Sequence, residues 1–333
     1  MMVRKRVHAN NLVCWAKDKP DVLVLSADLT SSCEADAFRD TYPDRFYSMG
    51  IAEHNMLGFA GGLAREGFVP FIHTFAVFIY RRALDQIAMS VEYPNLPVNM
   101  IGFLPGVTTP GGATHQAIED ISVMRSLPNM TVLEVGDATE VESVLQAAYD
   151  IPGPVYIRML RGEVPTLFDT PLEVGKPRCL QRGEDLVIVS SGLCTEEALR
   201  TVRILEANGV SASLFHVSSL KPFGCEEILQ AAEKAKYGVI TLENHTILGG
   251  LGSCMAEAMA EAGIGRRLIR LGIQDQFLHG ASRPYLMHEY GLDAEALLAA
   301  VGRAVGHSLL WKPEELGEAF LPAMLSDAKP EAL

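Results

Sequence analysis

The sequence has little positive charge and shows no extended basic face. It contains 28 Lys and Arg against 41 Asp and Glu, which gives a formal net charge of -13 at pH 7. A surface that binds nucleic acid needs clustered Lys and Arg to neutralise the phosphates. The composition therefore argues against a nucleic-acid-binding protein, and we expect no nucleic-acid partner.

Long hydrophobic runs are also missing. A membrane-spanning helix needs about 20 predominantly apolar residues in a row, and the chain contains no such run. The first residues, MMVRKRVHANNLVCWAKD, carry positive charge but lack the apolar stretch of a signal peptide. We therefore expect a soluble, cytoplasmic protein with no membrane partner.

Cysteine is scarce, and the common phosphate-binding loop is absent. The six cysteines are scattered, without the paired spacing of a zinc site or a redox motif. We therefore expect reduced and mostly buried thiols. The pattern GxxxxGK(S/T), which would indicate a nucleotide phosphate loop, does not occur.

What the sequence does have is enough apolar material for two cores. The chain has 333 residues, of which 48% are hydrophobic and 21% charged. A domain typically takes about 100 to 200 residues, so the length suggests two globular domains. In the first half, helical patterns alternate with short apolar runs, namely DVLVLSADL, FYSMGI, FVPFIHTF, PVNMIGF, TVLEVG and PVYIRML. This alternation predicts a largely parallel sheet with helices on both faces.

The alternation of apolar runs and helical patterns stops after Arg161 and then resumes. Proline and glycine without any period predict a linker at residues 166–182. A second alternation follows, with the apolar runs DLVIVSSG, VSASLFHVSS, YGVITLEN and RLIRLGI. The predicted fold is therefore α/β, with two open, mostly parallel, doubly wound sheets. The predicted layout is a domain at 1–165, the linker, a domain at 183–310 and an acidic tail at 311–333.

One candidate for chemistry is a lone acid in a nearly apolar stretch. The segment GIAEHNM places Glu53 where an extended run turns into a helix. An acid in the first turn of a helix is most often ordinary, because it complements the positive end of the helix dipole. In an apolar setting such a carboxylate can also accept a proton in catalysis, so both interpretations stay open at this point.

Two further segments follow the next apolar runs. The segment HTFAVFIYRRALDQI places Phe75, Phe78 and Arg82 at helical spacing on one face, which by itself indicates a core stripe. The segment PGVTTPGGATHQAIED ends a glycine-rich loop with His115, and an isolated histidine there is more often structural than catalytic. Ligands of open α/β sheets bind beyond the carboxyl ends of the strands, where we expect these loops to converge.

Together, in order and spacing, the three segments resemble the middle domain of transketolases. The matching patterns are GIAE(H/Q)NM, TFxxFxxRAxDQI and GxTHQxxED. The resemblance continues through LPNMTVLEVGDATE, VYIRMLRGEVP, TLENHTILGGLGS and GIQDQFLHGASRPYLMHEYGLD, and covers the chain from about residue 8 to about residue 305. The chain is thus similar to the pyrimidine-binding and C-terminal domains of a transketolase.

The resemblance implies roles for individual residues. In the family, the carboxylate at the place of Glu53 bonds a ring nitrogen of the aminopyrimidine of thiamine diphosphate and so activates the cofactor. Phe75 and Phe78 match aromatic residues that pack against the pyrimidine, and Arg81 belongs to the same cofactor-binding segment. His115 resembles the histidine that hydrogen-bonds the sugar's oxygens or relays a proton. The expected catalytic residues are therefore Glu53 and His115.

One family motif is not in this sequence. The motif that binds the diphosphate and the metal is a GDG followed by an Asn pair, and the domain that bears it normally precedes the pyrimidine-binding domain. Because the chain begins at Met1 with the latter, the resemblance implies a split enzyme and no metal ligand in this chain. We expect a separate N-terminal subunit that holds Mg²⁺ or Ca²⁺, shares thiamine diphosphate with this chain, and assembles with it as a dimer of heterodimers.

Three positions near the substrate depart from the family. Gly111 stands where many members have an aspartate, Phe103 where phosphosugar enzymes often have a histidine, and Asp36 near the place of a phosphate-binding arginine. Loss of charge-assisted contacts, worth roughly 1.5 to 3 kcal/mol each, should weaken the binding of an ordinary sugar phosphate. Arg161 matches an arginine that holds the distal anion of the acceptor. We expect Arg161, with Arg158 or the partner chain, to recognise another phosphosugar in a shifted pose, a sulfonate or an uncharged sugar.

The predicted function is transfer of a two-carbon ketol group from a ketose to an aldose through thiamine diphosphate, by a transketolase-type transferase of which this chain is one half. The beta chain of a 2-oxo-acid dehydrogenase is an alternative, because it pairs the same two domains and needs a partner. A deoxyxylulose-phosphate synthase fragment is less favoured, because that enzyme is usually one chain. A non-catalytic scaffold subunit is a further alternative, which the presence of Glu53, Phe75 and His115 disfavours.

Overall fold

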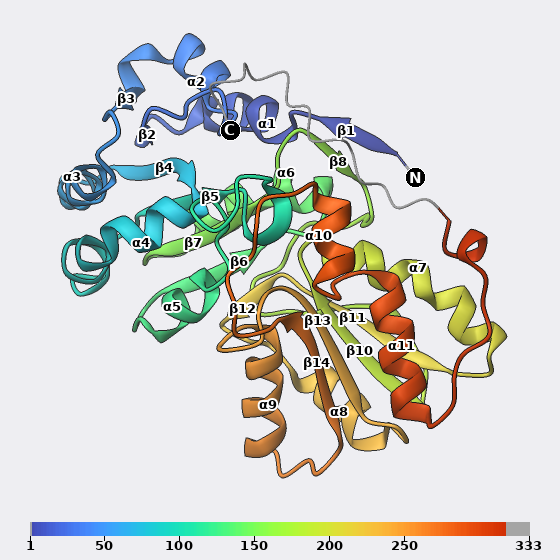
Figure 1. The fold of residues 1–333 in the computed structure, drawn as a ribbon. Coiled ribbons are helices and arrows are strands. Elements are labelled where there is room, and N and C mark those ends of the chain that lie inside the picture. The colour runs from blue at the N-terminus through green and yellow to red at the C-terminus, as the bar shows by residue number, and fades with distance from the viewer. Residues whose placement is uncertain (1, 318–333) are drawn as a thin grey trace.

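The computed structural model describes residues 2–317, and Figure 1 shows them as two α/β units side by side. The first unit, blue to green in the figure, is built on a seven-stranded sheet, and the second, yellow to red, on a five-stranded sheet. The predicted tail at 311–333 lies outside the described residues except for 311–317. Within the described part of the chain, no helix is long and apolar enough to cross a membrane.

The first sheet has the strand order β12-β6-β7-β5-β4-β2-β3, and every neighbouring pair is parallel except β12 with β6. Its strands are β2 (Val22–Ser26), β3 (Phe46–Ser48), β4 (Val69–Phe75), β5 (Asn99–Phe103), β6 (Thr131–Glu134), β7 (Val155–Met159) and β12 (Ser219–Lys221). Strands β2 and β5 are buried at every position. Central strands of a parallel sheet are covered on both faces, and for this reason their sequences are continuous apolar runs.

Helices cover both faces of this sheet (Figure 1). They are α1 (Val7–Trp15), α2 (Asp36–Thr41), α3 (Glu53–Arg65), α4 (Ala76–Gln86), α5 (Asp120–Ser126) and α6 (Ala138–Tyr149). Helix α1 contacts α2 and α6, whereas α3, α4 and α5 contact one another in sequence and form the opposite layer. Short helical turns complete the unit: η1 (Ala16–Asp18), η2 (Pro43–Arg45), the π-helix η3 (Ile87–Glu92) and η4 (Gly106–Thr108).

The second sheet has the order β14-β13-β10-β11-β9, with only β9 antiparallel to its neighbour. Its strands are β9 (Arg178–Gln181), β10 (Leu186–Ser191), β11 (Ala212–Val217), β13 (Val239–Thr246) and β14 (Leu268–Ile273). The helices are α7 (Cys194–Ala207), α8 (Glu226–Lys234), α9 (Leu251–Glu261), α10 (Arg283–Glu289) and α11 (Ala294–Val305), followed by η5 (Pro313–Leu316). Alternate residues of β10 belong to different cores, so both faces of this sheet are also buried.

The structure confirms the predicted fold class of two mostly parallel α/β sheets, because the apolar runs form the strands of both. Short strands depart from the predicted layout. Strand β9 lies within residues 166–182, which were predicted as a linker, and β12 comes from the predicted second domain but pairs with β6 of the first sheet. A two-stranded ribbon of β1 (Val3–Lys5) and β8 (Glu163–Pro165) was also not predicted. Strands of three or four residues are too short to show a period in the sequence.

A buried polar cluster joins the two units beside β12. Glu140 of α6 accepts hydrogen bonds from the ring Nε2 of His216 (3.0 Å), from Ser218 Oγ (2.6 Å) and from the amide of Gly136 (2.9 Å). Its carboxylate also pairs with Arg178, at 3.0 Å. Burial works to raise the pKa of Glu140, but the attraction of His216 and these hydrogen bonds outweigh it and lower the pKa to about 2.

Replacement of Glu140 by Gln should change how stability depends on pH. The pKa of about 2 in the folded protein lies below the ordinary value of 4.5. The carboxylate therefore stabilises the fold fully above about pH 4.5, and this contribution is lost as the pH falls toward about 2. Urea unfolding over this range should give Glu140→Gln a lower free energy of unfolding near neutral pH and a shallower decline in acid.

The matched control is Glu142→Gln. Glu142 lies on the same helix as Glu140, but it forms a half-exposed ion pair with Arg4, and such pairs contribute little to stability. This variant should unfold much like the wild type. If the free energy of unfolding fell equally steeply in acid for the wild type and for Glu140→Gln, the Glu140 carboxylate would not stabilise the fold in this way.

Candidate active site

The predicted site residues gather at the carboxyl edge of the first sheet. Glu53 follows β3, and Phe75 ends β4. The loop with His115 follows β5, and Arg161 follows β7. Because these strands are parallel, their carboxyl ends share one edge, where open α/β sheets bind their ligands.

Glu53 is a buried carboxylate with one oxygen left over. It begins α3 with 2% of its surface exposed, at the end of the helix where the dipole favours a negative charge. Its Oε1 accepts a hydrogen bond of 2.7 Å from Nη1 of Arg82. Among residues 2–317, Oε2 has no hydrogen-bond partner, so this oxygen is available to a bound molecule.

Phe75 and Phe78 form an aromatic wall next to this carboxylate. Their rings are stacked, with centroids 5.7 Å apart and planes inclined by 26°. The ring of His115 meets Phe78 edge-on, at 5.5 Å between centroids. The guanidinium of Arg82 lies 3.8 Å from the centroid of Phe78, so Arg82 links the wall to Glu53. Phe75 is buried and therefore fixed by packing, whereas Phe78 is half-buried and leaves part of its ring accessible.

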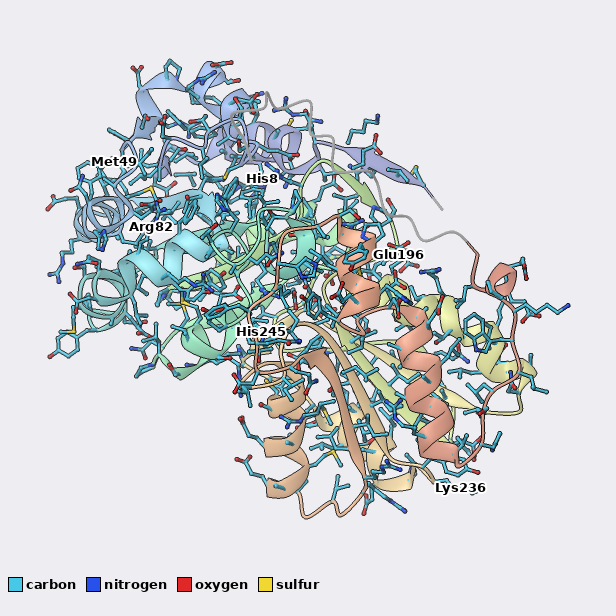
Figure 2. The ribbon with its side chains drawn as sticks, viewed as in Figure 1. His8, Met49, Arg82, Glu196, Lys236 and His245 are labelled. Atoms are coloured by element: carbon cyan, nitrogen blue, oxygen red, sulfur yellow. The ribbon has the colours of Figure 1, made fainter. Side chains whose placement is uncertain are left out.

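The two neighbouring arginines of α4 have different contacts. Arg82, labelled in Figure 2, pairs with Glu53. Arg81 donates hydrogen bonds to Glu119 (2.7 and 2.9 Å) and to the carbonyl of Ala113 (2.7 Å). Arg81 therefore holds the loop before α5, and Arg82 is the arginine beside the carboxylate; that Arg81 binds the cofactor stays a prediction. The sequence signal was the spacing of one helical turn that places Arg82 on the face of the aromatic pair.

His115 lies half-buried in the loop between β5 and α5. Thr114 Oγ1 is 2.9 Å from its Nδ1, which leaves Nε2 for other contacts. Gly111 lies directly against this ring, because a Cβ built at Gly111 would be 2.8 Å from Cβ of His115. The glycine therefore contributes space rather than a contact, and an aspartate in its place would require His115 to move.

Arg161 lies half-buried beside Phe75 of the aromatic wall. Its guanidinium is 5.7 Å from the ring centroid of Phe75, and Nη1 donates a hydrogen bond to the carbonyl of Ser32. Its Nε is buried and has no partner among the described residues. Burial lowers the pKa of Arg161, and the neighbouring Cys33 and Glu34 work against this shift. Arg161 thus keeps a buried donor without a partner close to the site.

Arg158 cannot contact a substrate in this structure. Its guanidinium is fully buried and donates to both oxygens of Asp120 (2.8 and 2.9 Å), to Glu134 (2.6 Å), and to the carbonyls of Ala117 (2.9 Å) and Asn244 (3.0 Å). These five hydrogen bonds use all five N–H groups of an arginine. Burial works to raise the pKa of Asp120, but the charge of Arg158 outweighs it and the pKa is lowered. In this structure Arg158 thus has a structural role, and a contact with substrate stays a prediction.

Phe103 is also not available to a substrate. It is fully buried at the end of β5 and meets the ring of His8 edge-on, with centroids 5.4 Å apart. His8 and His73 lie with their Nε2 atoms 2.9 Å apart, and burial lowers the pKa of His73 to about 4. Phe103 thus packs against a neutral histidine pair beneath the site and has no exposed surface in this structure, so that it binds substrate stays a prediction.

The chain's residues fit the aminopyrimidine part of thiamine diphosphate. A planar ring against the wall of Phe75 and Phe78 would gain stacking contacts, and the free Oε2 of Glu53 could accept a hydrogen bond from a ring nitrogen. Within residues 2–317, no three side chains of His, Cys, Asp or Glu come together in an arrangement that could hold a metal ion.

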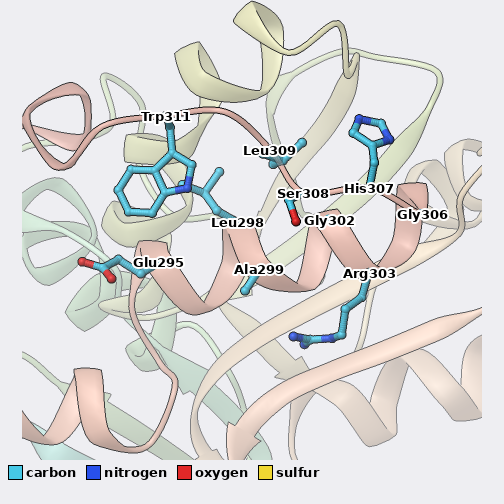
Figure 3. A pocket seen from close by; sticks show the side chains of 10 residues that line it. All are labelled: Glu295, Leu298, Ala299, Gly302, Arg303, Gly306, His307, Ser308, Leu309 and Trp311. Carbon is cyan, nitrogen blue, oxygen red and sulfur yellow. The ribbon is translucent and has the colours of Figure 1, made fainter.

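A separate pocket lies in the second unit, between α11 and the chain that follows it (Figure 3). Its volume is 760 Å³, and its lining residues are Glu295, Leu298, Ala299, Gly302, Arg303, Gly306, His307, Ser308, Leu309 and Trp311. None of the predicted site residues lines this pocket, so it is distinct from the carboxyl edge of the first sheet.

Two open parallel sheets, with a buried acid, an aromatic pair and a histidine at the carboxyl edge of the first, define a transketolase-like protein. Comparison with known families agrees with this class. Residues 3–166 match the transketolase pyrimidine-binding domain, and residues 175–297 match the transketolase C-terminal domain. The chain therefore belongs to the transketolase family, which confirms the resemblance seen in the sequence.

Individual relatives agree over most of their length. A transketolase family protein of Sinorhizobium fredii is 40% identical over 300 residues, covering 88% of this chain and 86% of the relative. A 6-deoxy-6-sulfo-D-fructose transketolase subunit of Clostridium sp. is 36% identical over 292 residues, covering 87% of this chain and 90% of the relative. A solved structure described as a split gene transketolase, inactive beta4 tetramer, is 38% identical with a TM-score of 0.83, covering 90% of this chain and 97% of that chain.

Arg158→Met should strongly destabilise the protein, because it leaves the buried carboxylates of Asp120 and Glu134 without their cation. Removal of one partner from a buried ion pair typically costs about 3–5 kcal/mol. The free energy of unfolding, measured with urea at neutral pH, should fall by about this amount. Arg182→Met, which removes the exposed pair with Glu227, should leave stability nearly unchanged. A small effect of Arg158→Met would contradict the structural role assigned here.

Proposed function

We propose that this chain is the C-terminal subunit of a transketolase that moves a two-carbon ketol group from a ketose to an aldose, and that it is active only with a separate N-terminal subunit. The observation that carries the proposal is the free Oε2 of the buried Glu53 beside the stacked rings of Phe75 and Phe78. When bound, thiamine diphosphate supplies the carbon nucleophile and the electron sink for breaking the carbon–carbon bond of the ketose.

Glu53 and Arg82 act together on the cofactor's ring. Arg82 occupies Oε1 and fixes the plane of the carboxylate, so that Oε2 is directed at one position beside the aromatic wall. There Oε2 would hold a ring nitrogen by a hydrogen bond, and the low exposure of Glu53 would keep water from competing for it. Phe75 and Phe78 would pack against the face of the ring.

His115 is placed to handle protons on the sugar. Thr114 engages its Nδ1, so Nε2 is the nitrogen that holds or gives up a proton at a hydroxyl or carbonyl oxygen of the substrate. The edge-on contact with Phe78 keeps the imidazole next to the ring on which the cofactor stacks. A histidine in this place can donate a hydrogen bond in one step and accept one in the next.

The diphosphate and its metal require groups from another chain. The solved relative described as a split gene transketolase, inactive beta4 tetramer, supports a partner requirement, since its name describes an inactive assembly of beta chains. A dimer of heterodimers, with the site formed where the subunits meet, would supply Mg²⁺ or Ca²⁺ ligands from the N-terminal subunit.

Calorimetric titration of thiamine diphosphate with Mg²⁺ tests the split site. We expect no binding to this chain alone and tight binding to an equimolar mixture with its N-terminal subunit. Tight binding to the isolated chain would contradict the shared site. In the mixture, Glu53→Gln should lower turnover by at least about 100-fold. Glu66→Gln, which changes an exposed acid just after the end of the same helix, should leave turnover unchanged.

The same mixture separates the other enzyme class. A 2-oxo-acid dehydrogenase component would turn over a 2-oxo acid with a lipoyl carrier and would leave ketoses unchanged. If this chain were a scaffold subunit, the mixture would show the same turnover with the wild type and with Glu53→Gln. Ketol transfer that depends on Glu53 is therefore the result that supports the proposal.

We propose further that the distal group of the sugar carries one negative charge, as a sulfonate does, and that Arg161 binds it. Arg161 is the predicted anion-binding arginine that keeps an unpaired donor, since the donors of Arg158 are all used. Phe103 is buried, and Asp36 forms an ion pair with Arg6. The similarity to a 6-deoxy-6-sulfo-D-fructose transketolase subunit supports a sulfonate in particular.

Kinetics with three ketoses test this assignment. We expect a higher kcat/KM for 6-deoxy-6-sulfofructose than for xylulose 5-phosphate or uncharged xylulose. Arg161→Ala should lower kcat/KM for the sulfonate about 10- to 150-fold, the equivalent of a charge-assisted hydrogen bond of roughly 1.5–3 kcal/mol. The uncharged ketose is the internal control and should be little affected. Similar efficiency on all three ketoses would refute the assignment.

A further inference from the structure

The loop that carries His115, residues 104–119, is fastened by the second unit. Asn244, near the end of β13, donates from Nδ2 to the carbonyl of Pro105 (3.1 Å) and accepts at Oδ1 from the amide of Val107 (2.9 Å). Asn244 is fully buried. One side chain of the second sheet thus satisfies two backbone groups at the start of the loop.

The end of the loop is held by β13 and by the segment that follows β14. The amide of Thr246 donates to the carbonyl of Ile118 (2.8 Å), and the side chain of Gln116 donates to the carbonyl of His279 (3.3 Å). Figure 2 labels His245, the residue between Asn244 and Thr246, at the junction of the units. The loop is therefore attached to the second unit on both sides of its catalytic histidine.

Gly106 makes the contact with Asn244 unusually close. Its φ is +54°, in the left-handed region that favours glycine. A Cβ built there would be 2.1 Å from Oδ1 of Asn244 and 2.6 Å from its Nδ2. Even an alanine at position 106 would therefore push the asparagine side chain away from the loop.

Arg158 supports the same contact from behind. Its guanidinium donates to the backbone carbonyl of Asn244 (3.0 Å) and to that of Ala117 (2.9 Å). The strand that bears Asn244 and the loop that bears His115 are thus tied to one buried cation. Arg158 therefore helps to hold the loop in place at the carboxyl edge of the first sheet.

We propose that Asn244 is a positioning residue that sets the place of His115 against the substrate, an inference that rests on the proposed function. The second unit supplies none of the residues assigned above to the cofactor or the sugar, yet it determines where the catalytic histidine lies. A displacement of about 1 Å in such a group can cost about 100-fold in rate. Loss of the Asn244 contact should lower kcat and leave cofactor binding unchanged, because Glu53, Phe75 and Phe78 lie on other elements.

The experiment compares Asn244→Ala and Gly106→Ala in the assembled enzyme. Each variant breaks the same contact from one side. Both should lower kcat about 10- to 100-fold and should bind thiamine diphosphate as the wild type does. In a His115→Ala background neither change should lower kcat further, because the group that they position is gone.

Asn208→Ala is the matched control. Asn208 lies in the same unit and also makes two side-chain hydrogen bonds to one backbone segment, to the amide (2.7 Å) and carbonyl (2.8 Å) of Leu310. It should leave kcat and the exchange of the loop amides unchanged. Equal losses of kcat in Asn208→Ala and Asn244→Ala would overturn the proposal, because the effect would then come from general loosening of the unit.

Amide hydrogen exchange gives a readout that does not need turnover. In the assembled wild type, amides of residues 105–119 should exchange slowly, and they should exchange faster in Asn244→Ala and Gly106→Ala while β2 and β4 stay protected. If the wild type lacks ketol transfer, the proposed function fails, and this exchange pattern still decides whether Asn244 orders the loop. Unchanged exchange in both variants, or loss of the cooperative unfolding transition in both, would overturn the positioning role.

Discussion

The fold depends on one buried charge that must be neutralised from several directions at once. The guanidinium of Arg158 has no contact with water, and an unpaired cation in such a place would cost several kcal/mol. Its five N–H groups are satisfied by α5, β6, the loop before α5 and β13 of the second unit. These elements come from both units, so neither can shift far without exposing a charge or leaving a donor unpaired. Together with the pairing of β12 with β6 and the cluster around Glu140, this requirement holds the two sheets in their relative placement.

The site follows from the parallel arrangement of the first sheet. Parallel strands direct all their carboxyl ends to one edge, so residues far apart in the sequence meet there without a special connection. Glu53, Phe75 and Phe78 each stand within a few residues of a strand's end, and His115 lies in the loop that follows β5. The polar residues of the site are then held by hydrogen bonds from their neighbours, as Arg82 holds Glu53 and Thr114 holds His115. Rigid elements carry the side chains, and short hydrogen bonds orient them.

The sequence predicts the strands and the gathering of the site well, and predicts the contacts of single polar residues poorly. Apolar runs identify buried parallel strands directly, and so the convergence of Glu53, Phe75 and His115 could be expected. Spacing along a chain does not say whether a strand residue faces a ligand or the interior, and the burial of Arg158 and Phe103 could not be read from it for this reason. The contact of Asn244 with Val107 spans 137 positions, and no local pattern reveals a pair at that separation.

Strand β12 couples the two units through a shared sheet edge. A segment that belongs to the second unit in sequence completes the edge of the first sheet by pairing with β6. A cut in the gene between the two units would remove this edge strand and expose the backbone of β6, which invites aggregation. The two units are therefore coupled through the sheet itself, and separating them at this point would break a sheet edge rather than a simple linker.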